Sequence, residues 1–239
     1  METRTVALLS ASAILVRGGC AGPRAAAPRE VGISSAMVRG AARTTPPEIA
    51  ALAEGLQAGD YVVYRFSGSF RKASAAPLTL TERVLGREGR VLSLEVILDD
   101  GAKKQTIHLH KDSTPGAARE VFDVTSVEAG SERPATVEAY EAMMAKTVLA
   151  ADQNEEQLGT ETANVLLGGQ TLRCLKTSYR VRVGKHQATM STVTSETFPW
   201  GDVAGDITTL EGQVLYRVEV VDAGTSAHER GAGALAAAR

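Results

Sequence analysis

The feature that most constrains the fold is a strict alternation of apolar and polar residues between residues 90 and 98. The apolar positions recur at every second residue, and they are Leu92, Leu94, Val96 and Leu98. Ser93 and Glu95 occupy the positions between them. Side chains two residues apart share a face in a β-strand, so this stretch predicts a strand with one buried face. Asp99, Asp100 and Gly101 follow it as a hairpin signal.

The same period recurs on both sides of this strand and again in the last third of the chain. We predict further strands over residues 61–66, 78–85, 106–110, 120–127, 158–167, 170–183, 186–196, 205–211 and 214–222. One helix is predicted at about 134–151, where apolar residues repeat at spacings of three and four. Short turns join most of the strands, so the predicted fold class is mostly antiparallel β (α+β), with one long helix packed on the sheet.

Composition limits the classes of function. The 239 residues are 44% hydrophobic and 23% charged, which is typical of a globular protein. A net charge of −2 gives no general electrostatic reason to bind nucleic acid, and no nucleic-acid partner is predicted. The sequence has no G-x-S-x-G, P-loop, G-x-G-x-x-G or C-x-x-C motif. We therefore predict no cofactor and favour a protein that is not an enzyme.

The N-terminus has the pattern of a secretory signal peptide. Arg4 precedes an apolar run from Val6 to Val16, and the small residues Gly18 and Gly19 follow. The run is too short to span a bilayer, which takes about 20 residues. We predict a signal peptide over residues 1–19, a flexible Ala-, Gly- and Pro-rich tether over 20–46, a folded domain over 47–224 and a mobile tail over 225–239.

Cys20 follows this leader, and the stretch resembles the lipobox of bacterial lipoproteins. Gly18 and Gly19 match the two positions before the lipidated cysteine, whereas Arg17 stands where the motif carries Leu, Val, Ile or a small residue. The resemblance implies export and a lipid anchor on Cys20 in the cell envelope. Ala21 after the cysteine implies the outer membrane, facing the periplasm. The alternative is simple secretion after cleavage at the A-x-A sequence of residues 25–27.

The second cysteine, Cys174, has no intramolecular partner if Cys20 carries a lipid. A lone cysteine in an exported domain is more often a small buried apolar residue than a nucleophile. We therefore predict that Cys174 is buried.

Two histidines form the candidate metal site. His108 and His110 share one face of a predicted strand, so both can ligate one metal ion. A catalytic site needs about three protein ligands, and the sequence does not select the third. The alternative interpretation is two surface histidines after the Asp-Gly turn.

A cationic strand face and an aromatic turn are the other candidates for contact with a partner. Lys176, Arg180 and Arg182 share a face, which suits anionic lipid or polymer, or else a solvated face neutralised by acids such as Asp202, Asp206 and Glu211. Phe198, Pro199, Trp200 and Gly201 form a bend with a large apolar area. The bend fits a contact loop, the lip of a cleft, or a plug at the end of the sheet.

The stretch from Gly168 to Gly224 is similar to the C-terminal half of many uncharacterised exported bacterial proteins. Its features are a Gly-led strand that carries Cys174, the turn from Pro199 to Gly201, and a closing strand that ends at Gly224. The architecture also resembles the curved, open half-barrels of Lol-type lipoprotein carriers. This resemblance implies a curved open sheet or half-barrel with an apolar cavity for acyl chains.

Together these features predict a lipid-anchored envelope protein. We predict a non-catalytic binding or assembly module whose ligand is a lipid, a peptide or an envelope protein. The candidate ligand-binding residues are Leu92, Leu94, Val96, Phe198 and Trp200. The alternative is a metal-dependent envelope enzyme that uses His108 and His110.

Overall fold

The structure is a computed structural model that describes residues 55–71, 75–114, 120–149, 151 and 153–225. The predictions for the signal peptide, the lipidated Cys20, the tether and the chain after Thr225 lie outside these residues. No helix within the described ranges is both long and apolar enough to cross a membrane.

The described residues form eleven strands in one sheet. Their bounds are β1 (Asp60–Ser67), β2 (Leu78–Glu88), β3 (Val91–Asp99), β4 (Lys104–Asp112), β5 (Val121–Glu128), β6 (Ser131–Pro134), β7 (Gln153–Leu167), β8 (Gln170–Val183), β9 (His186–Thr194), β10 (Asp202–Thr209) and β11 (Val214–Thr225). All neighbouring strands are antiparallel. The predicted antiparallel fold class is confirmed.

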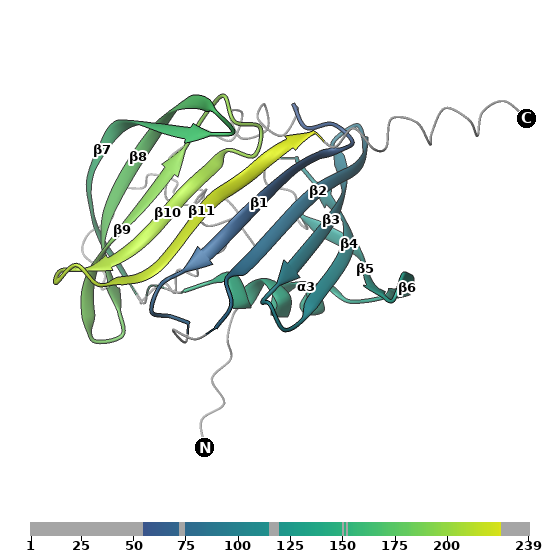
Figure 1. Ribbon diagram of the computed structural model, residues 1–239, viewed down its shortest axis with the longest axis horizontal. Helices are drawn as coiled ribbons and strands as arrows, with labels where there is room; N and C mark the ends of the chain where they lie inside the picture. Colours follow the sequence, from purple (N-terminus) through teal and green to yellow (C-terminus); the bar gives the residue numbers. More distant parts are fainter. Residues whose placement is uncertain (1–54, 72–74, 115–119, 150, 152, 226–239) are drawn as a thin grey trace, which may run out of the picture.

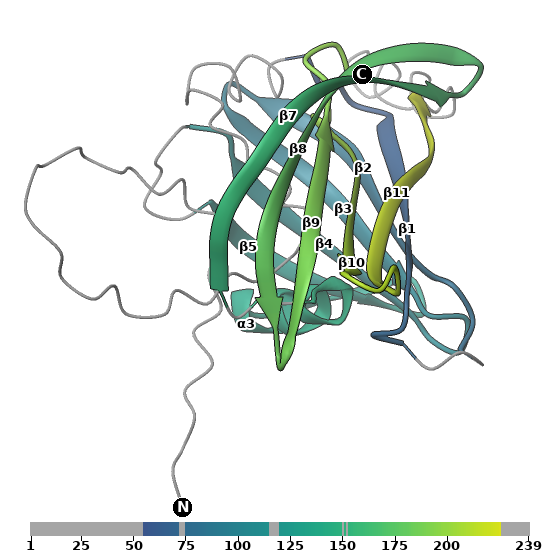
Figure 2. The same ribbon diagram turned by 90° about the vertical axis from the view of Figure 1, so that its left-hand side faces the viewer.

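Two meanders join in the middle of the sheet, where β1 pairs with β11. The strand order is β6-β5-β4-β3-β2-β1-β11-β10-β9-β8-β7, so β6 and β7 are the two edges and the sheet stays open between them. Figures 1 and 2 show that the sheet curves strongly around a concave side. We call β1–β6 the N-terminal wing and β7–β11 the C-terminal wing.

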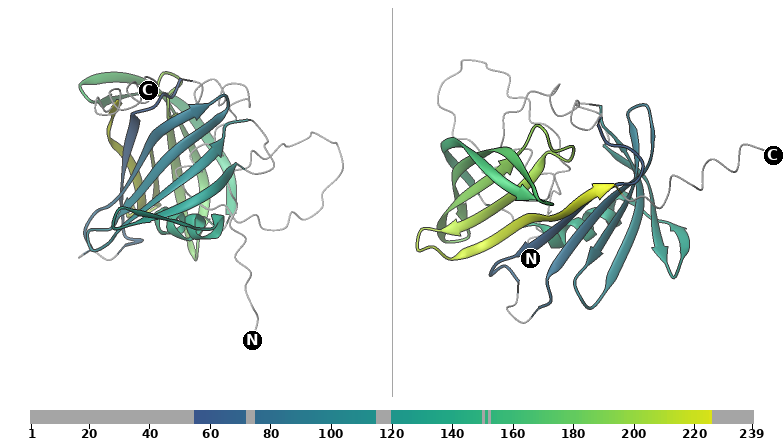
Figure 3. Two further views of the ribbon diagram at one scale, coloured as in Figure 1. Left: turned by 90° about the vertical axis from the view of Figure 1, so that its right-hand side faces the viewer. Right: turned by 45° about the horizontal axis from the view of Figure 1, so that its top comes forward.

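A short helical segment connects the two edges across the concave side. It consists of α3 (Val137–Met144) and the 3-10 turn η1 (Ala145–Thr147). Thr136 caps α3, because its Oγ1 accepts a hydrogen bond from the Ala139 N–H at 3.3 Å. Figure 3 shows α3 at one end of the N-terminal wing, inside the curve of the sheet.

The helix is shorter than the predicted span of about 134–151. Pro134 belongs to β6, and the α-helix ends at Met144. The next residues include the β-branched Thr147 and Val148, which favour helix less than unbranched residues. Thr147 Oγ1 donates to the Met144 carbonyl at 2.7 Å, and Val148 is already extended.

Candidate binding face

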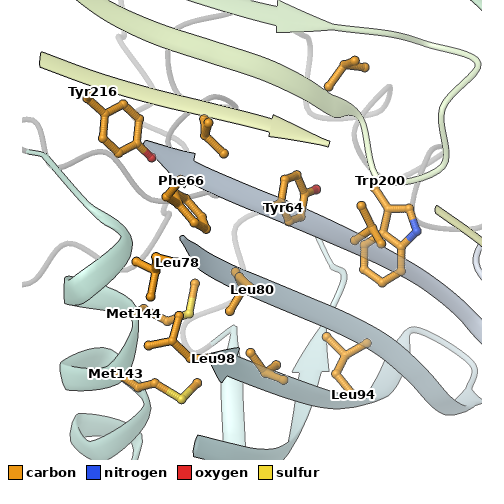
Figure 4. Close-up of a cluster of buried hydrophobic side chains, with 14 of the residues drawn as sticks. Tyr64, Phe66, Leu78, Leu80, Leu94, Leu98, Met143, Met144, Trp200 and Tyr216 are labelled. Atoms are coloured by element: carbon orange, nitrogen blue, oxygen red, sulfur yellow. The ribbon is translucent and has the colours of Figure 1, made fainter. Parts of the chain in front are cut away.

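One continuous apolar face lines the concave side of both wings. In the N-terminal wing its buried members are Val62, Tyr64, Phe66, Leu78, Leu80, Val84, Leu92, Leu94, Val96, Leu98, Ile107 and Leu109. In the C-terminal wing they are Tyr179, Val181, Ala188, Met190, Val203, Ile207, Tyr216 and Val218. We call this set the apolar face. Figure 4 shows part of it, with Met143 and Met144 of α3 directed toward Leu78 and Leu98.

The strand pairing explains why the face is continuous. Tyr64 lies opposite Leu80, and Leu80 lies opposite Leu98, so three neighbouring strands place large apolar side chains in one row. A second row runs from Val84 through Leu94 to Leu109. Side chains that are directly opposite on one face lie close enough to pack together. Three of the predicted ligand-binding residues, Leu92, Leu94 and Val96, belong to this face.

One carboxylate interrupts the N-terminal part of the apolar face. Glu82 lies opposite Val62 on one side and Val96 on the other, and both valines are buried. Glu82 itself is partly exposed. A charged group is costly in an apolar setting unless water or a partner reaches it. This row therefore marks a place where solvent approaches the concave side.

The aromatic turn between β9 and β10 closes one end of the apolar face. Phe198 and Trp200 are only 5% and 6% exposed. The Ser195 N–H donates to the Gly201 carbonyl at 2.9 Å, and the Gly201 N–H donates to the Phe198 carbonyl at 2.8 Å. Figure 4 shows Trp200 beside Tyr64 and above the strand that carries Leu94. Among the interpretations left open by the sequence, the geometry fits a plug best.

A buried hydrogen bond joins the helical segment to the centre of the sheet. Tyr216 of β11 is 1% exposed, and its hydroxyl donates to the Thr147 carbonyl at 3.0 Å. Burial raises the pKa of Tyr216 well above its ordinary value. The phenol stays neutral and holds η1 against the concave side.

A hollow of about 430 Å³ lies outside the predicted ligand site. It is lined by Phe122 to Val124 of β5 and by Pro134 to Glu138 at the start of α3. None of the five predicted ligand-binding residues lines it. Those five residues are all buried instead.

The two histidines share the convex face, as the alternation predicted, but each ring meets different carboxylates. His108 Nδ1 lies 2.8 Å from Glu132 Oε1, and its Nε2 lies 3.4 Å from Glu95 Oε2. His110 Nδ1 lies 3.5 Å from Asp123 Oδ2. Within the described ranges, no group of three His, Cys, Asp or Glu side chains is placed to hold a metal ion. The metal site stays a prediction without an identified third ligand.

The cationic face of β8 is neutralised by its neighbour β7. Lys176 pairs with Glu161 at 3.2 Å, Arg180 with Glu156 at 2.8 Å, and Arg182 with Glu155 at 2.8 Å. These acids come from the preceding strand and not from Asp202, Asp206 or Glu211. The arrangement matches a solvated outer face, with the counter-charges supplied across one strand pair.

Cys174 is buried, as predicted, with 3% exposure. Burial raises the pKa of its thiol, although a hydrogen bond with Ser195 opposes the rise. The thiol donates to the Leu172 carbonyl at 3.6 Å. A buried thiol with a raised pKa is a packing group and not an activated nucleophile.

Sequence reasoning missed Met143 and Tyr64 as members of the concave core. Met143 follows Tyr140 by three residues, so the helical spacing contained a signal for it. Tyr64 alternates with the exposed Arg65 in β1. Aromatic residues at inward positions were therefore the available signal.

Comparisons with known proteins give only distant likenesses. No family model matches the chain, and no curated protein matches it. Hypothetical protein CT021 of Chlamydia trachomatis has a similar structure, with a TM-score of 0.41 and 9% identity over 82% of this chain and 94% of that chain.

Two further structures are similar at 10% identity. One is a predicted lipoprotein from Parabacteroides distasonis, with a TM-score of 0.35 over 70% of this chain and 96% of that chain. The other is a protein from Bacteroides fragilis, described as exported and YmcC-like in fold, with a TM-score of 0.34 over 71% and 97%. At TM-scores below 0.5, these likenesses carry no argument about function. The class that the geometry itself defines is an open antiparallel half-barrel with an apolar concave face.

Proposed function

We propose that the protein is an exported envelope protein, anchored by a lipid on Cys20, that binds an apolar ligand on the concave side of its half-barrel without catalysis. The observation that carries this proposal is the apolar face, which extends over both wings. Within the described residues, the short α3–η1 segment, the turn that carries Trp200 and the loop after β1, whose Phe70 ring contacts Tyr216, lie against it. An acyl chain is the ligand chemistry that such a face recognises.

Two features make the concave side suitable for an exchangeable ligand. Met143 and Met144 cover part of it, and methionine side chains adapt their shape at low cost. Glu82 shows where solvent approaches the face, so a ligand has a route to it. A fatty acid or phospholipid tail would take the place of the Met143 and Met144 side chains on the apolar face.

Trp200 is the only tryptophan, so its fluorescence tests ligand binding directly. A fatty acid brominated in mid-chain should quench Trp200, whereas the unbrominated acid should not. The matched control is the double variant W200F/L210W, which moves the reporter to a turn where Leu210 is 64% exposed. Equal quenching of both reporters, or none of Trp200, would contradict an apolar ligand on the concave side.

A separate measurement tests the anchor. Intact-mass spectrometry of the full chain purified from membranes should show loss of residues 1–19 and an acylated Cys20. A Cys20→Ser variant should leave the membrane fraction. Unmodified protein in the soluble fraction would contradict the lipid anchor but leave the ligand experiment unaffected.

A further inference from the structure

The longest hairpin of the sheet projects beyond its neighbours. β8 pairs with β9 only from Leu175 onward, so residues 163–175 form a tip around the Gly168-Gly169 turn that extends past the end of β9. We call these residues the hairpin tip. Figures 2 and 3 show it bending over one end of the half-barrel, and β7 reaches β11 there.

The two faces of the hairpin tip differ in chemistry. On one face Val165, Leu167 and Leu172 pack against the core, and Cys174 is buried. The Ser195 hydroxyl also donates to the Arg173 carbonyl at 2.9 Å, which ties the tip to the aromatic turn. These contacts hold the tip in place. Its other face therefore cannot collapse onto the body of the protein.

That other face exposes leucines around a cation. The register places Leu166 opposite Thr171, Asn164 opposite Arg173 and Thr162 opposite Leu175. Leu166 is 72% exposed and Leu175 is 46% exposed, while Arg173 between them is also exposed. Apolar side chains beside a cation are the composition that binds the interface of a bilayer with anionic lipids.

The hairpin tip lies at the end of the molecule where the described chain starts and stops. Asp60 pairs with Thr225, so β1 begins and β11 finishes at this end. Figure 1 shows these strand ends and the β7–β8 turn at the same end of the sheet, with the β10–β11 turn at the opposite end. The described chain therefore begins and ends at the same end of the sheet as the tip.

The length of the predicted tether favours this end of the sheet as the end that lies nearer to a membrane that holds Cys20. A flexible chain the length of residues 20–46 has a root-mean-square span of about 30 Å. The twelve residues of β11 extend about 40 Å. Bringing the opposite end to the bilayer would stretch the tether along the whole body, which costs chain entropy.

We propose that the hairpin tip is a membrane-contact element, with Leu166 and Leu175 in the interface of the bilayer that holds the Cys20 lipid and with Arg173 among anionic headgroups. This inference rests on the proposed anchor. It adds an orientation, in which the aromatic turn faces the membrane and the β10–β11 turn faces away.

Lipid-borne quenchers test this orientation. The full acylated chain is labelled with an environment-sensitive fluorophore at Leu166→Cys or, as the matched control, at Leu210→Cys on the opposite end. Burial protects Cys174, and the anchor occupies the Cys20 thiol, so the introduced cysteine is the reactive one. The proteins are reconstituted in phosphatidylethanolamine–phosphatidylglycerol vesicles that contain nitroxide lipids.

We expect several-fold stronger quenching and a bluer emission at position 166 than at position 210. Equal quenching at the two positions would overturn the inference even if the protein is acylated. A blue shift at 166 that appears without vesicles and grows with protein concentration would also overturn it, in favour of contact between copies of this chain. The intact mass shows independently whether Cys20 is acylated. If Cys20 is not acylated, stronger quenching at position 166 than at position 210 would still support contact of the tip with the membrane.

Discussion

The two wings belong to one curved sheet, but they differ in the polarity of their buried residues. The buried residues of the described N-terminal wing are all hydrophobic. The buried polar residues of the described chain all lie at or after Thr147, and in the C-terminal wing they include Thr177, Thr192 and Thr209. The N-terminal wing therefore depends on burial of apolar surface, and the C-terminal wing also depends on satisfied hydrogen bonds.

This difference has a consequence for the proposed ligand. A hydrocarbon chain on the N-terminal wing separates no buried polar group from its partner. On the C-terminal wing it would approach groups such as Thr192, whose hydroxyl donates to the Thr177 carbonyl at 3.5 Å. Leaving a buried polar group without a partner costs about 1–3 kcal/mol. The N-terminal wing is therefore the better place for an exchangeable apolar ligand.

The largest expected effect comes from truncating the N-terminal part of the apolar face. Leu80 is 0% exposed and lies between Tyr64 and Leu98. Leu80→Ala should lower the free energy of unfolding by about 2–5 kcal/mol, because it leaves a cavity and loses apolar burial. Urea denaturation measures this change.

Thr192→Val in the C-terminal wing is the matched control for Leu80→Ala. It keeps the side-chain shape and removes one long hydrogen bond, so its cost should be about 1 kcal/mol or less. Similar losses in the two variants would mean that the wings do not differ in what stabilises them.

An intermediate effect is expected where η1 meets the centre of the sheet. Tyr216→Phe removes the hydrogen bond to the Thr147 carbonyl and should cost about 1–3 kcal/mol, because that carbonyl belongs to a fully buried residue. Thermal and urea unfolding at neutral pH measure the loss. A change within experimental error would show that η1 is held by packing alone.

The same variant should flatten the alkaline part of the stability profile. Burial raises the pKa of Tyr216, so the folded protein keeps a proton that the unfolded chain loses above its ordinary pKa of about 10. The stabilising contribution is complete below about pH 10 and declines as the pH rises further. Between about pH 9 and about pH 11, on either side of the ordinary tyrosine pKa of about 10, the free energy of unfolding should therefore fall more in the wild type than in Tyr216→Phe.

The sequence predicted the strands best where one face is apolar and the other polar. β3 is the clearest case, because its buried and half-buried residues alternate along its length. β6 was missed because all four of its residues are exposed, so no period marks it. The predicted helix was too long because apolar spacing continues through Val148, whereas the backbone becomes extended there.

The sequence did not predict which residues lie opposite one another on paired strands. The pairing of β1 with β11 joins residues about as far apart as the domain allows, as in Asp60 and Thr225. The acids that face the β8 cations depend on the β7 register, which includes two bulges. A shift of one residue would turn Glu156 and Glu161 to the other face of the strand. Side-chain alternation fixes which face a residue occupies but not which residue lies opposite.

The smallest expected effects lie on the convex face and complete the comparison of the wings. In the C-terminal wing, Arg180 and Glu156 form a pair whose side chains are 45% and 57% exposed. In the N-terminal wing, Arg83 and Glu95 are 35% and 19% exposed, and Glu95 also lies near His108. Coupling energies from double-mutant cycles should be about 0.2–1 kcal/mol for the Arg180–Glu156 pair and larger for the Arg83–Glu95 pair.

The coupling energies of the two ion pairs should also differ in their dependence on salt concentration. Raising the ionic strength screens exposed charges more than partly buried ones. The Arg180–Glu156 coupling should therefore fade in high salt, while the Arg83–Glu95 coupling should persist in part. If both couplings vanish together, the convex face of the N-terminal wing is as solvated as that of the C-terminal wing. The difference between the wings would then be confined to the concave side, where the apolar face and the buried threonines lie.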